Sequence, residues 1–380
     1  MDPDVRRRSD VGGSPFFPPR RAGGANRGRA GSVCPHLGRG RRPPPRGLPV
    51  GHRLTTVEQA VTSESARATV AVTIPTFKRP KQLKRLLATM PEQRSEAERD
   101  HRISTVLLVV DNDPAGSAHE TATESGATYI AEPRLGLAAV RNAALSAAFA
   151  AGADAIVFID DDELPHASWL TTLVGRWLRG DAEIVSGRVV STFDYPLDPW
   201  IEAGGFFRRV EFADDAAMRF APTNNLLLDV GFLQTHDLWF DADFALSGGE
   251  DIRLTSQALA LGARIRAVPD ALVTDPVPAT RATRAWVLRR AFRVGTTTAR
   301  CGVLLRPSAA GRLVERLAWL TRGITRVGVG SLRLLLGLLS RSVSHRARAA
   351  RQIARGTGMC AGAFGTQYRE YQARHTVKTG

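Results

Sequence analysis

The stretch Ala155–Glu163, which reads AIVFIDDDE, decides the fold because a short apolar run leads directly into four acids. Five apolar residues, mostly β-branched or aromatic, predict a strand that is buried on both faces, as in a parallel sheet. In open α/β sheets the ligand crevice lies at the carboxyl ends of the strands. Carboxylates crowded there raise one another's pKa unless a cation neutralises them, and oxygen ligands suit Mg²⁺ or Mn²⁺. The pattern predicts a metal–diphosphate site, with an acidic turn that caps the next helix as the alternative interpretation.

Length and composition limit the number of domains and indicate the cellular setting. The chain has 380 residues, enough for one large domain or two ordinary ones, and a formal net charge of +15, much of it near the two ends. Its three cysteines, Cys34, Cys301 and Cys360, are far apart in the sequence. They indicate a reducing, cytoplasmic setting and argue against both a disulfide framework and a structural zinc site.

The amino-terminal segment, residues 1–66, is rich in Arg, Pro and Gly. This composition cannot bury enough apolar surface to order itself, so a disordered basic tail is predicted. No apolar run of signal-peptide length occurs in it, and we therefore do not expect a secretory leader. A tail that touches nucleic acid or acidic lipid and a solvated extension without a function both fit the segment.

Strand and helix patterns alternate from residue 69 onward. Strands are expected at 69–74, 105–110, 127–130, 155–159, 184–190, 221–228 and 265–268. Helical patterns separate several of them, notably at 137–150, and this order predicts an α/β fold with a Rossmann-like, mostly parallel sheet flanked by helices. No glycine-rich phosphate loop follows any strand, which disfavours a dehydrogenase or a P-loop nucleotidase. Phosphate would instead be held by the metal and by basic side chains such as Arg134 and Arg141.

Five short motifs, each weak alone, follow one another in a recognisable order. They are VTIPTFKR at 72–79, VVDN at 109–112, GLAAVRN at 136–142, FIDDD at 158–162 and GGED at 248–251. In this order they resemble the family 2 glycosyltransferases, over roughly residues 69–300. The resemblance implies a GT-A fold, a nucleotide-diphosphate-sugar donor, a divalent cation (Mg²⁺ or Mn²⁺) and transfer with inversion at the anomeric carbon.

The resemblance also implies donor-binding roles. The loop Pro75, Thr76 and Phe77 would cradle the nucleoside, and Asp111 would accept a hydrogen bond from the base, which favours uracil. Arg134 and Arg141 lie where the family approaches the diphosphate or the ribose. The acidic run resembles the family's D-x-D motif, best aligned as metal ligands Asp160 and Asp162; Asp161, between them, leaves a shifted register open.

The GGED motif opens a predicted helix. Glu250 and Asp251 would sit at its positive end, where the helix field favours the ionised form that a general base needs. The resemblance assigns the base to Asp251 and a positioning role to Glu250, whereas capping of the helix explains the same acids without chemistry.

Acceptor and metal roles are less constrained by the pattern. Asn224 and Asn225 are candidate ligands for acceptor hydroxyls, or else they satisfy loop backbone. Asp275 stands near where relatives carry a histidine that helps to hold the metal, which leaves the third ligand open.

The carboxyl-terminal segment changes composition again. Arginines and leucines alternate from residue 312 at helical spacing, which predicts a basic amphipathic helical region at 306–380. Its apolar runs are too short and too interrupted to span a bilayer. A helix lying on anionic lipid and a helix packed on the catalytic domain both fit. The expected domain between the two ends covers 67–305, with a nucleotide-binding half at 67–165 and an acceptor and catalytic half at 166–305.

These observations predict an inverting glycosyltransferase. It would transfer a sugar from a nucleotide-diphosphate donor, most simply a UDP-sugar, to a hydroxyl of a glycan or lipid-linked acceptor in cell-surface or exopolysaccharide biosynthesis. The expected location is the cytoplasm, including the inner face of the plasma membrane. The alternatives are a sugar-nucleotidyltransferase and a non-catalytic basic protein that binds membranes or nucleic acid, although nucleic acid is the less expected partner.

Overall fold

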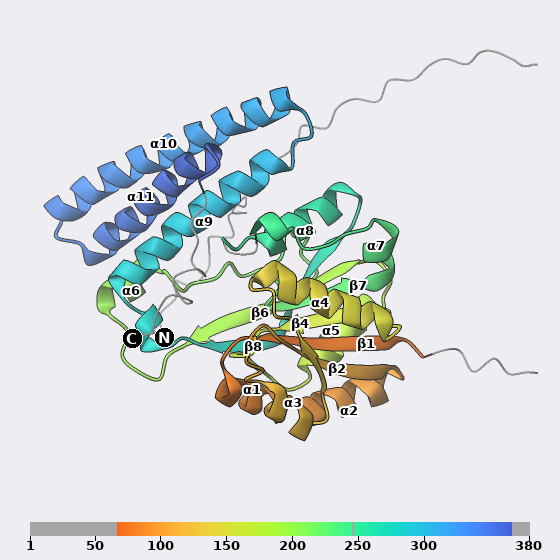
Figure 1. The fold of residues 1–380 in the computed structure, drawn as a ribbon. Coiled ribbons are helices and arrows are strands. Elements are labelled where there is room, and N and C mark those ends of the chain that lie inside the picture. The colour runs from red at the N-terminus through yellow and green to blue at the C-terminus, as the bar shows by residue number, and fades with distance from the viewer. Residues whose placement is uncertain (1–66, 245–246, 367–380) are drawn as a thin grey trace, which may run out of the picture. The chain divides into compact units, whose positions relative to one another are not determined.

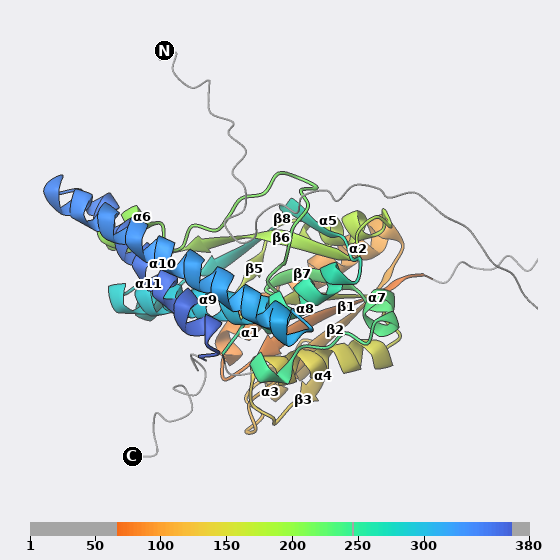
Figure 2. The same cartoon turned by 90° about the horizontal axis from the view of Figure 1, so that it is seen from above.

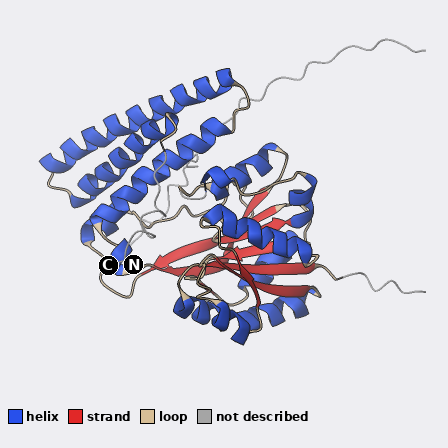
Figure 3. Cartoon of the chain, in the orientation of Figure 1, coloured by secondary structure: helices blue, strands red, loops and turns tan. Residues whose placement is uncertain are grey.

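The computed structural model describes residues 67–244 and 247–366. The predicted tail at 1–66 and the last residues of the carboxyl-terminal region lie outside the described residues. In the described part, helices cover both faces of a twisted sheet, and three long helices lie beside it (Figures 1 and 3). This is the α/β architecture that the sequence predicts.

One mixed sheet forms the centre of the fold. Its strands are β1 (Thr69–Thr76), β2 (Ser104–Asp111), β3 (Thr128–Ala131), β4 (Ala155–Ile159), β5 (Leu164–Pro165), β6 (Ile184–Thr192), β7 (Asn225–Asp229) and β8 (Ile265–Pro276). Their order across the sheet is β3-β2-β1-β4-β7-β6-β8-β5. The pairs among β3, β2, β1 and β4 are parallel, as are β6 and β8, whereas β7 runs antiparallel to both neighbours and β5 antiparallel to β8.

The helices that flank the sheet divide between its two faces. One face carries α1 (Pro80–Leu87), α2 (Met90–His101), α3 (His119–Glu124) and α5 (Trp169–Trp177), and the other carries α4 (Leu137–Ala150), α7 (Val230–Thr235) and α8 (Glu250–Ala260). Within β4, Val157 packs toward the first group and Phe158 toward the second, and all five residues of the strand are buried. A strand covered on both faces explains why its sequence is apolar without alternation.

Three helices follow the sheet. They are α9 (Arg284–Leu304), α10 (Ala309–Leu339) and α11 (Val343–Ala363), and they pack alongside one another (Figures 1 and 2). Glycines allow the close contact: a side-chain carbon at Gly358 would collide with the carbonyl of Phe292 on α9. Helix α11 also packs against the short α6 (Pro199–Gly204). No helix in the described ranges combines the length and the apolar character needed to cross a bilayer.

Strand register brings distant segments to one edge of the sheet. The carboxyl end of β4, at Ile159, pairs with Asn225 at the amino end of antiparallel β7. Thr76 ends the neighbouring strand β1, so three polar segments leave the sheet side by side. The strand expected at 221–228 begins only at Asn225, and the preceding residues, which include Pro222, form a loop at this edge. Proline has no backbone N–H to donate to a strand partner, which accounts for the later start.

Candidate functional site

A cavity of about 340 Å³ opens at this edge of the sheet. Its walls come from the segment after β1, the acidic run after β4, the loop before β7, the start of α8 and the side of α9. The structure brings most of the sequence-predicted residues together there: Pro75, Thr76, Phe77, Arg141, Asp160, Asp161, Asp162, Asn224, Glu250 and Asp251.

Asp161 and Asp162 are held by a guanidinium that the sequence analysis did not single out. Arg79 Nη1 donates to Asp161 Oδ1 at 2.8 Å and to Asp162 Oδ2 at 2.7 Å. Thr76 Oγ1 donates to the other oxygen of Asp161 at 2.7 Å. Burial raises the pKa of Asp161, and Arg79 opposes that shift. Asp161 is therefore turned into the wall of the cavity, where it ties the end of β4 to the end of β1.

Asp160 has a more open setting. Its side chain is 40% exposed, and its nearest cation is Arg141, whose Nη2 lies 3.9 Å from Oδ1. Desolvation by the cavity walls raises the pKa of Asp160 to about 6; Arg141 opposes the shift, and Asp162 and Asp161 add to it. A carboxylate crowded by other acids and open to the cavity is well suited to a metal ion.

Arg141 connects the acidic run to α8. This arginine comes from the first turn of α4, is buried, and forms an ion pair with Glu250, whose side chain is only 1% exposed. Burial raises the pKa of Glu250 to about 7, while Arg141 lowers it and neighbouring Asp251 raises it further. One guanidinium thus stands between Asp160 at the sheet edge and the first residue of α8.

The start of α8 presents Asp251 to the cavity. The N-cap residue is Gly249, at φ 100°, and no side chain caps the helix. A side-chain carbon at Gly249 would also collide with Thr297 of α9, so glycine is required there for both reasons. Asp251 Oδ1 accepts a bond from the N–H of its neighbour Ile252 rather than capping the turn.

A second polar group lies on the β7 side of the cavity. Glu163 is buried and accepts a hydrogen bond from Asn224 Nδ2. Burial, with Asp160 adding to it, raises the pKa of Glu163 well above its ordinary value, and Arg209 counteracts this. Arg209 Nη2 also donates to Asp275 Oδ2 at 2.9 Å, so Asp275 lines the same cavity but is already paired with a cation.

Several buried acceptor atoms in the wall lack a partner. Thr223 Oγ1, Asn224 Oδ1 and Glu250 Oε2 are buried without a hydrogen bond among the described residues. All three side chains belong to the lining of the cavity. Because an unsatisfied buried polar atom is costly, a ligand that offers hydroxyl or amide donors would stabilise this wall.

Three predicted site residues do not line the cavity. The carboxylate of Asp111 accepts bonds from the backbone N–H groups of Asp113 and Ala118, at 2.9 Å each, and therefore holds the loop after β2. The exposed side chain of Arg134 pairs with Glu132. Asn225 is buried within the sheet, where Trp169 Nε1 donates to its Oδ1 at 2.9 Å. Their ligand-binding roles stay predictions, and the structure gives each of them a supporting contact.

The structure also adds residues that the sequence analysis passed over. These are Arg79 and Glu163, which are part of the cavity. Arg281, Arg290 and Arg293 line its α9 side, and the sequence places these three in an arginine-rich segment around Trp286, part of which is expected to face the diphosphate. Arg79 lies within the first motif and Glu163 directly follows the aspartates, so both stood in quoted segments. A charged residue next to a motif is commonly a solvated one, and only the fold shows that these side chains turn inward.

The fit of a divalent cation rests on the donor atoms. The side chains of Asp160 and Asp162 offer oxygen ligands only, the type that Mg²⁺ and Mn²⁺ prefer when substrate phosphates complete the shell. Among the described residues, no group of three or more His, Cys, Asp or Glu side chains is arranged to hold a metal by itself. The residues therefore fit a cation that is shared with a phosphate-bearing ligand.

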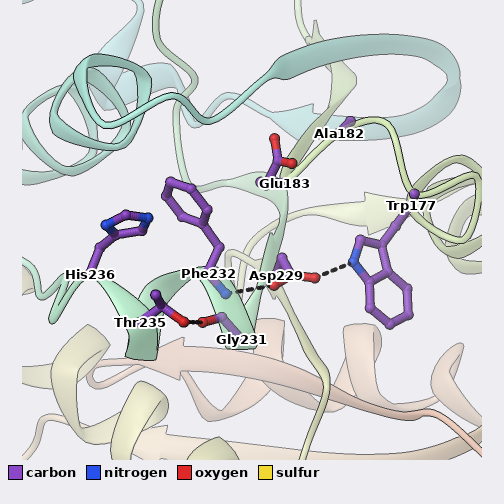
Figure 4. A pocket seen from close by; sticks show the side chains of 9 residues that line it. Trp177, Ala182, Glu183, Asp229, Gly231, Phe232, Thr235 and His236 are labelled. Atoms are coloured by element: carbon purple, nitrogen blue, oxygen red, sulfur yellow. Dashed lines mark hydrogen bonds between the residues drawn. The ribbon is translucent and has the colours of Figure 1, made fainter.

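A different pocket lies at the opposite end of the same strands (Figure 4). It measures about 290 Å³ and adjoins Asp229, which pairs with Ala155 at the amino end of β4. Asp229 accepts hydrogen bonds from Trp177 Nε1 at 2.9 Å and from the Phe232 N–H at 2.7 Å. Its carboxylate thus caps α7 and anchors α5, which is a structural role.

Comparison with solved structures identifies the class of the fold. The fold is of the GT-A glycosyltransferase type: the structure resembles the mannosyltransferase PcManGT from Pyrobaculum calidifontis, solved with GDP-Man and Mn²⁺, with a TM-score of 0.53 and 16% identity over 80% of this chain and 89% of that one. The structure of S. aureus TarS 1–349 with UDP-GlcNAc also matches, with a TM-score of 0.42 and 16% identity over 79% of this chain and 93% of that one.

Sequence comparison finds a family match over part of the chain. Residues 71–233 match the family model described as glycosyl transferase family 2. The chain is 29% identical over 219 residues to the succinoglycan biosynthesis protein ExoM of Rhizobium meliloti (strain 1021), which is 56% of this chain and 68% of that protein. The stretch that matches the family model contains four of the five motifs, and the fifth, GGED at 248–251, lies beyond it.

The buried pair of Arg141 and Glu250 makes a prediction about stability. Glu250 has a folded pKa of about 7, above its ordinary 4.5, so it is ionised and needs Arg141 at pH 8 but is largely neutral at pH 5. Replacing Arg141→Gln should cost about 3–5 kcal/mol of unfolding free energy at pH 8 and clearly less at pH 5. Urea denaturation at the two pH values measures both costs.

The matched control is Arg188→Gln. It breaks an exposed pair with Glu211 and should cost less than about 1 kcal/mol at either pH. If Arg141→Gln were as mild as Arg188→Gln, or equally costly at the two pH values, the ion pair would not have the role described.

Proposed function

We propose that this glycosyltransferase works with inversion, takes a nucleotide-diphosphate sugar as donor and transfers the sugar to a hydroxyl of a glycan or lipid-linked acceptor. The observation that carries the proposal is the meeting of two groups in one cavity: the carboxylates of Asp160 and Asp162 at the sheet edge, and that of Asp251 at the start of α8. The first group suits a cation and a diphosphate, and the second suits a proton acceptor.

Asp251 acts as the general base in this proposal. Its carboxylate takes the proton of the acceptor hydroxyl while the hydroxyl oxygen forms a bond to the anomeric carbon. The bond between that carbon and the donor phosphate breaks in the same step, and the nucleoside diphosphate leaves with the electron pair. Glu250, fixed by Arg141, positions the first turn of α8 so that Asp251 faces the cavity.

The leaving diphosphate needs positive charge around it. Arg281, Arg290 and Arg293 line the α9 side of the cavity and would face that group. A divalent cation held by Asp160 and Asp162, when bound, would neutralise the developing charge on the diphosphate. Pro75, Thr76 and Phe77 would hold the nucleoside at the end of β1.

The orphaned acceptor atoms support a sugar ligand. Thr223 Oγ1, Asn224 Oδ1 and Glu250 Oε2 would each gain a hydrogen bond from a hydroxyl, of which a sugar offers many. Two relatives agree with this chemistry: ExoM is described as a succinoglycan biosynthesis protein, and PcManGT was solved with GDP-Man and Mn²⁺. We therefore place the reaction in cell-surface or exopolysaccharide synthesis, with UDP as the preferred nucleotide on the motif resemblance.

The outer face of α10 supports a position on an anionic membrane. Leu317, Ile324, Leu332, Leu335 and Leu339 are each more than half exposed and lie on the side opposite the packed glycines. The arginines of α10 lie to one side of this apolar face, so the helix is basic and amphipathic, as is a helix that lies in the headgroup region of acidic lipid. In this proposal one side of α10 packs on its neighbours and the other side contacts the membrane. We propose that the enzyme works at the cytoplasmic face of the membrane.

Catalysis is tested with a donor panel. UDP- and GDP-sugars with Mg²⁺ or Mn²⁺ should release nucleoside diphosphate, and a chelator should stop the release. Asp251→Asn should lower acceptor-dependent transfer by about 10²–10⁴-fold because the proton acceptor is lost, while UDP still binds. Asp162→Ala should abolish the metal dependence together with most of the activity.

Asp100→Asn, an exposed substitution on α2, is the control and should keep wild-type activity. Full transfer by Asp251→Asn, or metal-independent transfer by the wild type, would contradict the proposed mechanism.

Membrane contact is tested by sedimentation with vesicles that contain phosphatidylglycerol. Leu335→Gln combined with Leu339→Gln should weaken binding at least about ten-fold, because the buried area of two leucines is lost. The matched control, Leu178→Gln with Leu261→Gln, changes exposed leucines elsewhere in the fold and should bind as the wild type does. Equal binding by both variants would show that α10 is not the membrane face.

A further inference from the structure

A third cavity, apart from the two described above, is rich in arginines. It measures about 780 Å³ and lies between α6, the segment that follows α6, and helices α10 and α11. As far as the structure describes its lining, seven arginines face it and Glu202 is the one acid. We call this cavity the arginine pocket. Its lining includes Arg209, Arg326, Arg333, Arg348, Arg351 and Arg355.

The arginines form two rows that the helix packing forces together. Arg326 and Arg333 are seven residues apart on α10. Arg348, Arg351 and Arg355 follow one another on α11 at intervals of three and four residues, so each set lies on one side of its helix. Close approach of the helices needs glycine: a side-chain carbon at Gly330 of α10 would press on Ile353 and on the carbonyl of Ala349, both from α11. The fold thus brings like charges close, which is unfavourable unless negative charge joins them.

Part of this positive charge has a structural use. Arg348 Nε donates to the carbonyl of Ala203 at 3.3 Å, and Arg351 Nη1 donates to the carbonyl of Gly205. These bonds hold the carboxyl end of α6 against α11. Arg326 and Arg333 differ, because neither has a hydrogen bond or an ion pair with any described residue.

The electrostatics differ from those of the other half-buried arginines in the fold. Arg79, Arg141 and Arg176 each have a carboxylate oxygen within 3 Å. In the arginine pocket, burial and the neighbouring cations Arg326 and Arg351 lower the pKa of Arg355 to about 9. Burial likewise lowers the pKa of Arg326 and, with Arg326 adding to it, that of Arg351. A cluster of this kind is stabilised by an anion with several oxygens, for which guanidinium groups are well shaped.

We propose that the arginine pocket binds a phosphate or diphosphate group of a ligand other than the sugar donor. Arg209 lines both this pocket and the cavity that holds Asp251, so the two are neighbours. If the proposed transfer reaction holds, a phosphorylated acceptor anchored here would extend its hydroxyl end past Arg209 toward the base. The same phosphate chemistry is found in a lipid headgroup and in a soluble phosphorylated ligand.

The test uses inorganic pyrophosphate as the probe and the full chain, without metal. Calorimetric titration at low ionic strength should show binding to the wild type. Arg326→Gln combined with Arg333→Gln should weaken it at least about ten-fold, because two unpaired guanidinium groups are lost. These two residues are chosen because they make no bond that holds the fold; unchanged thermal unfolding of the variant verifies this.

The control variant, Arg316→Gln with Arg341→Gln, removes the same charge from exposed positions of the same helical region outside the pocket, and should bind pyrophosphate as the wild type does. Binding that is absent in the wild type, or equally weakened in both variants, would overturn the proposal. So would wild-type affinity in the Arg326 and Arg333 variant, because pyrophosphate would then sit elsewhere.

Competition distinguishes the two sources. Phosphatidylcholine vesicles that contain phosphatidate should displace pyrophosphate if the pocket takes a lipid headgroup and should leave it bound if the ligand is soluble; both results support a phosphate pocket. UDP binding with Mn²⁺ is measured in parallel and should be the same in all three proteins. If the wild type does not bind UDP, this result counts against the proposed transfer reaction and not against the arginine pocket.

Discussion

The crowding of carboxylates at the carboxyl end of β4 is the constraint on which the rest of the structure depends. Four acids in succession leave a buried strand, and burial raises the pKa of Asp160, Asp161 and Glu163. The fold meets this cost with arginines from separate elements: Arg79 from the loop after β1 and Arg141 from α4. These cations lie in the wall, and Asp160 is left open to the cavity. Because the arginines compensate only part of the negative charge of these acids, the site favours a further cation together with the ligand that carries it.

Arg141 links the two halves of the site. It reaches Asp160 on one side and Glu250 on the other, so the acidic edge of the sheet and the first turn of α8 share one buried cation. Loss of this guanidinium would raise the pKa of Glu250 further, so that ionising this buried carboxyl next to Asp251 would become more costly. The acidic edge of the sheet and the start of α8 are therefore coupled through the side chain of Arg141. The ion pair explains how the GLAAVRN and GGED motifs, which are far apart in the sequence, contribute to the same cavity.

Local sequence patterns predicted the elements better than the contacts between them. The bounds of β4 follow from its unbroken apolar run and those of α4 from its alanine-rich helical pattern, and both agree with the sequence analysis. Asp111 and Asn225 show the limit: each is polar and follows or begins a strand, but their bonds to Ala118 and Trp169 depend on loop and helix positions that no short window contains. The reversal of β7 was equally hidden, since an apolar run has no direction.

The carboxyl-terminal helices extend the site rather than merely covering it. Helix α9 contributes arginines to the cavity that contains Asp160 and Asp251, and α10 and α11 form the arginine pocket with the segment after α6. The apolar face of α10 lies on the other side of the same helix. In this account the proposed membrane face and the arginine pocket lie on two sides of α10. Arg209 lines both the arginine pocket and the cavity of the proposed transfer reaction.

The central claim is that the acids after β4 share a cation with the diphosphate of the donor. Its most direct test is the affinity for Mn²⁺, measured from the free-ion electron paramagnetic resonance signal with and without UDP and corrected for the Mn²⁺ that UDP binds alone. The account predicts weak binding to the protein alone, at least about ten-fold tighter binding with UDP, and loss of that gain in Asp160→Asn. Equal affinity with and without UDP, or an undiminished gain in Asp160→Asn, would contradict it.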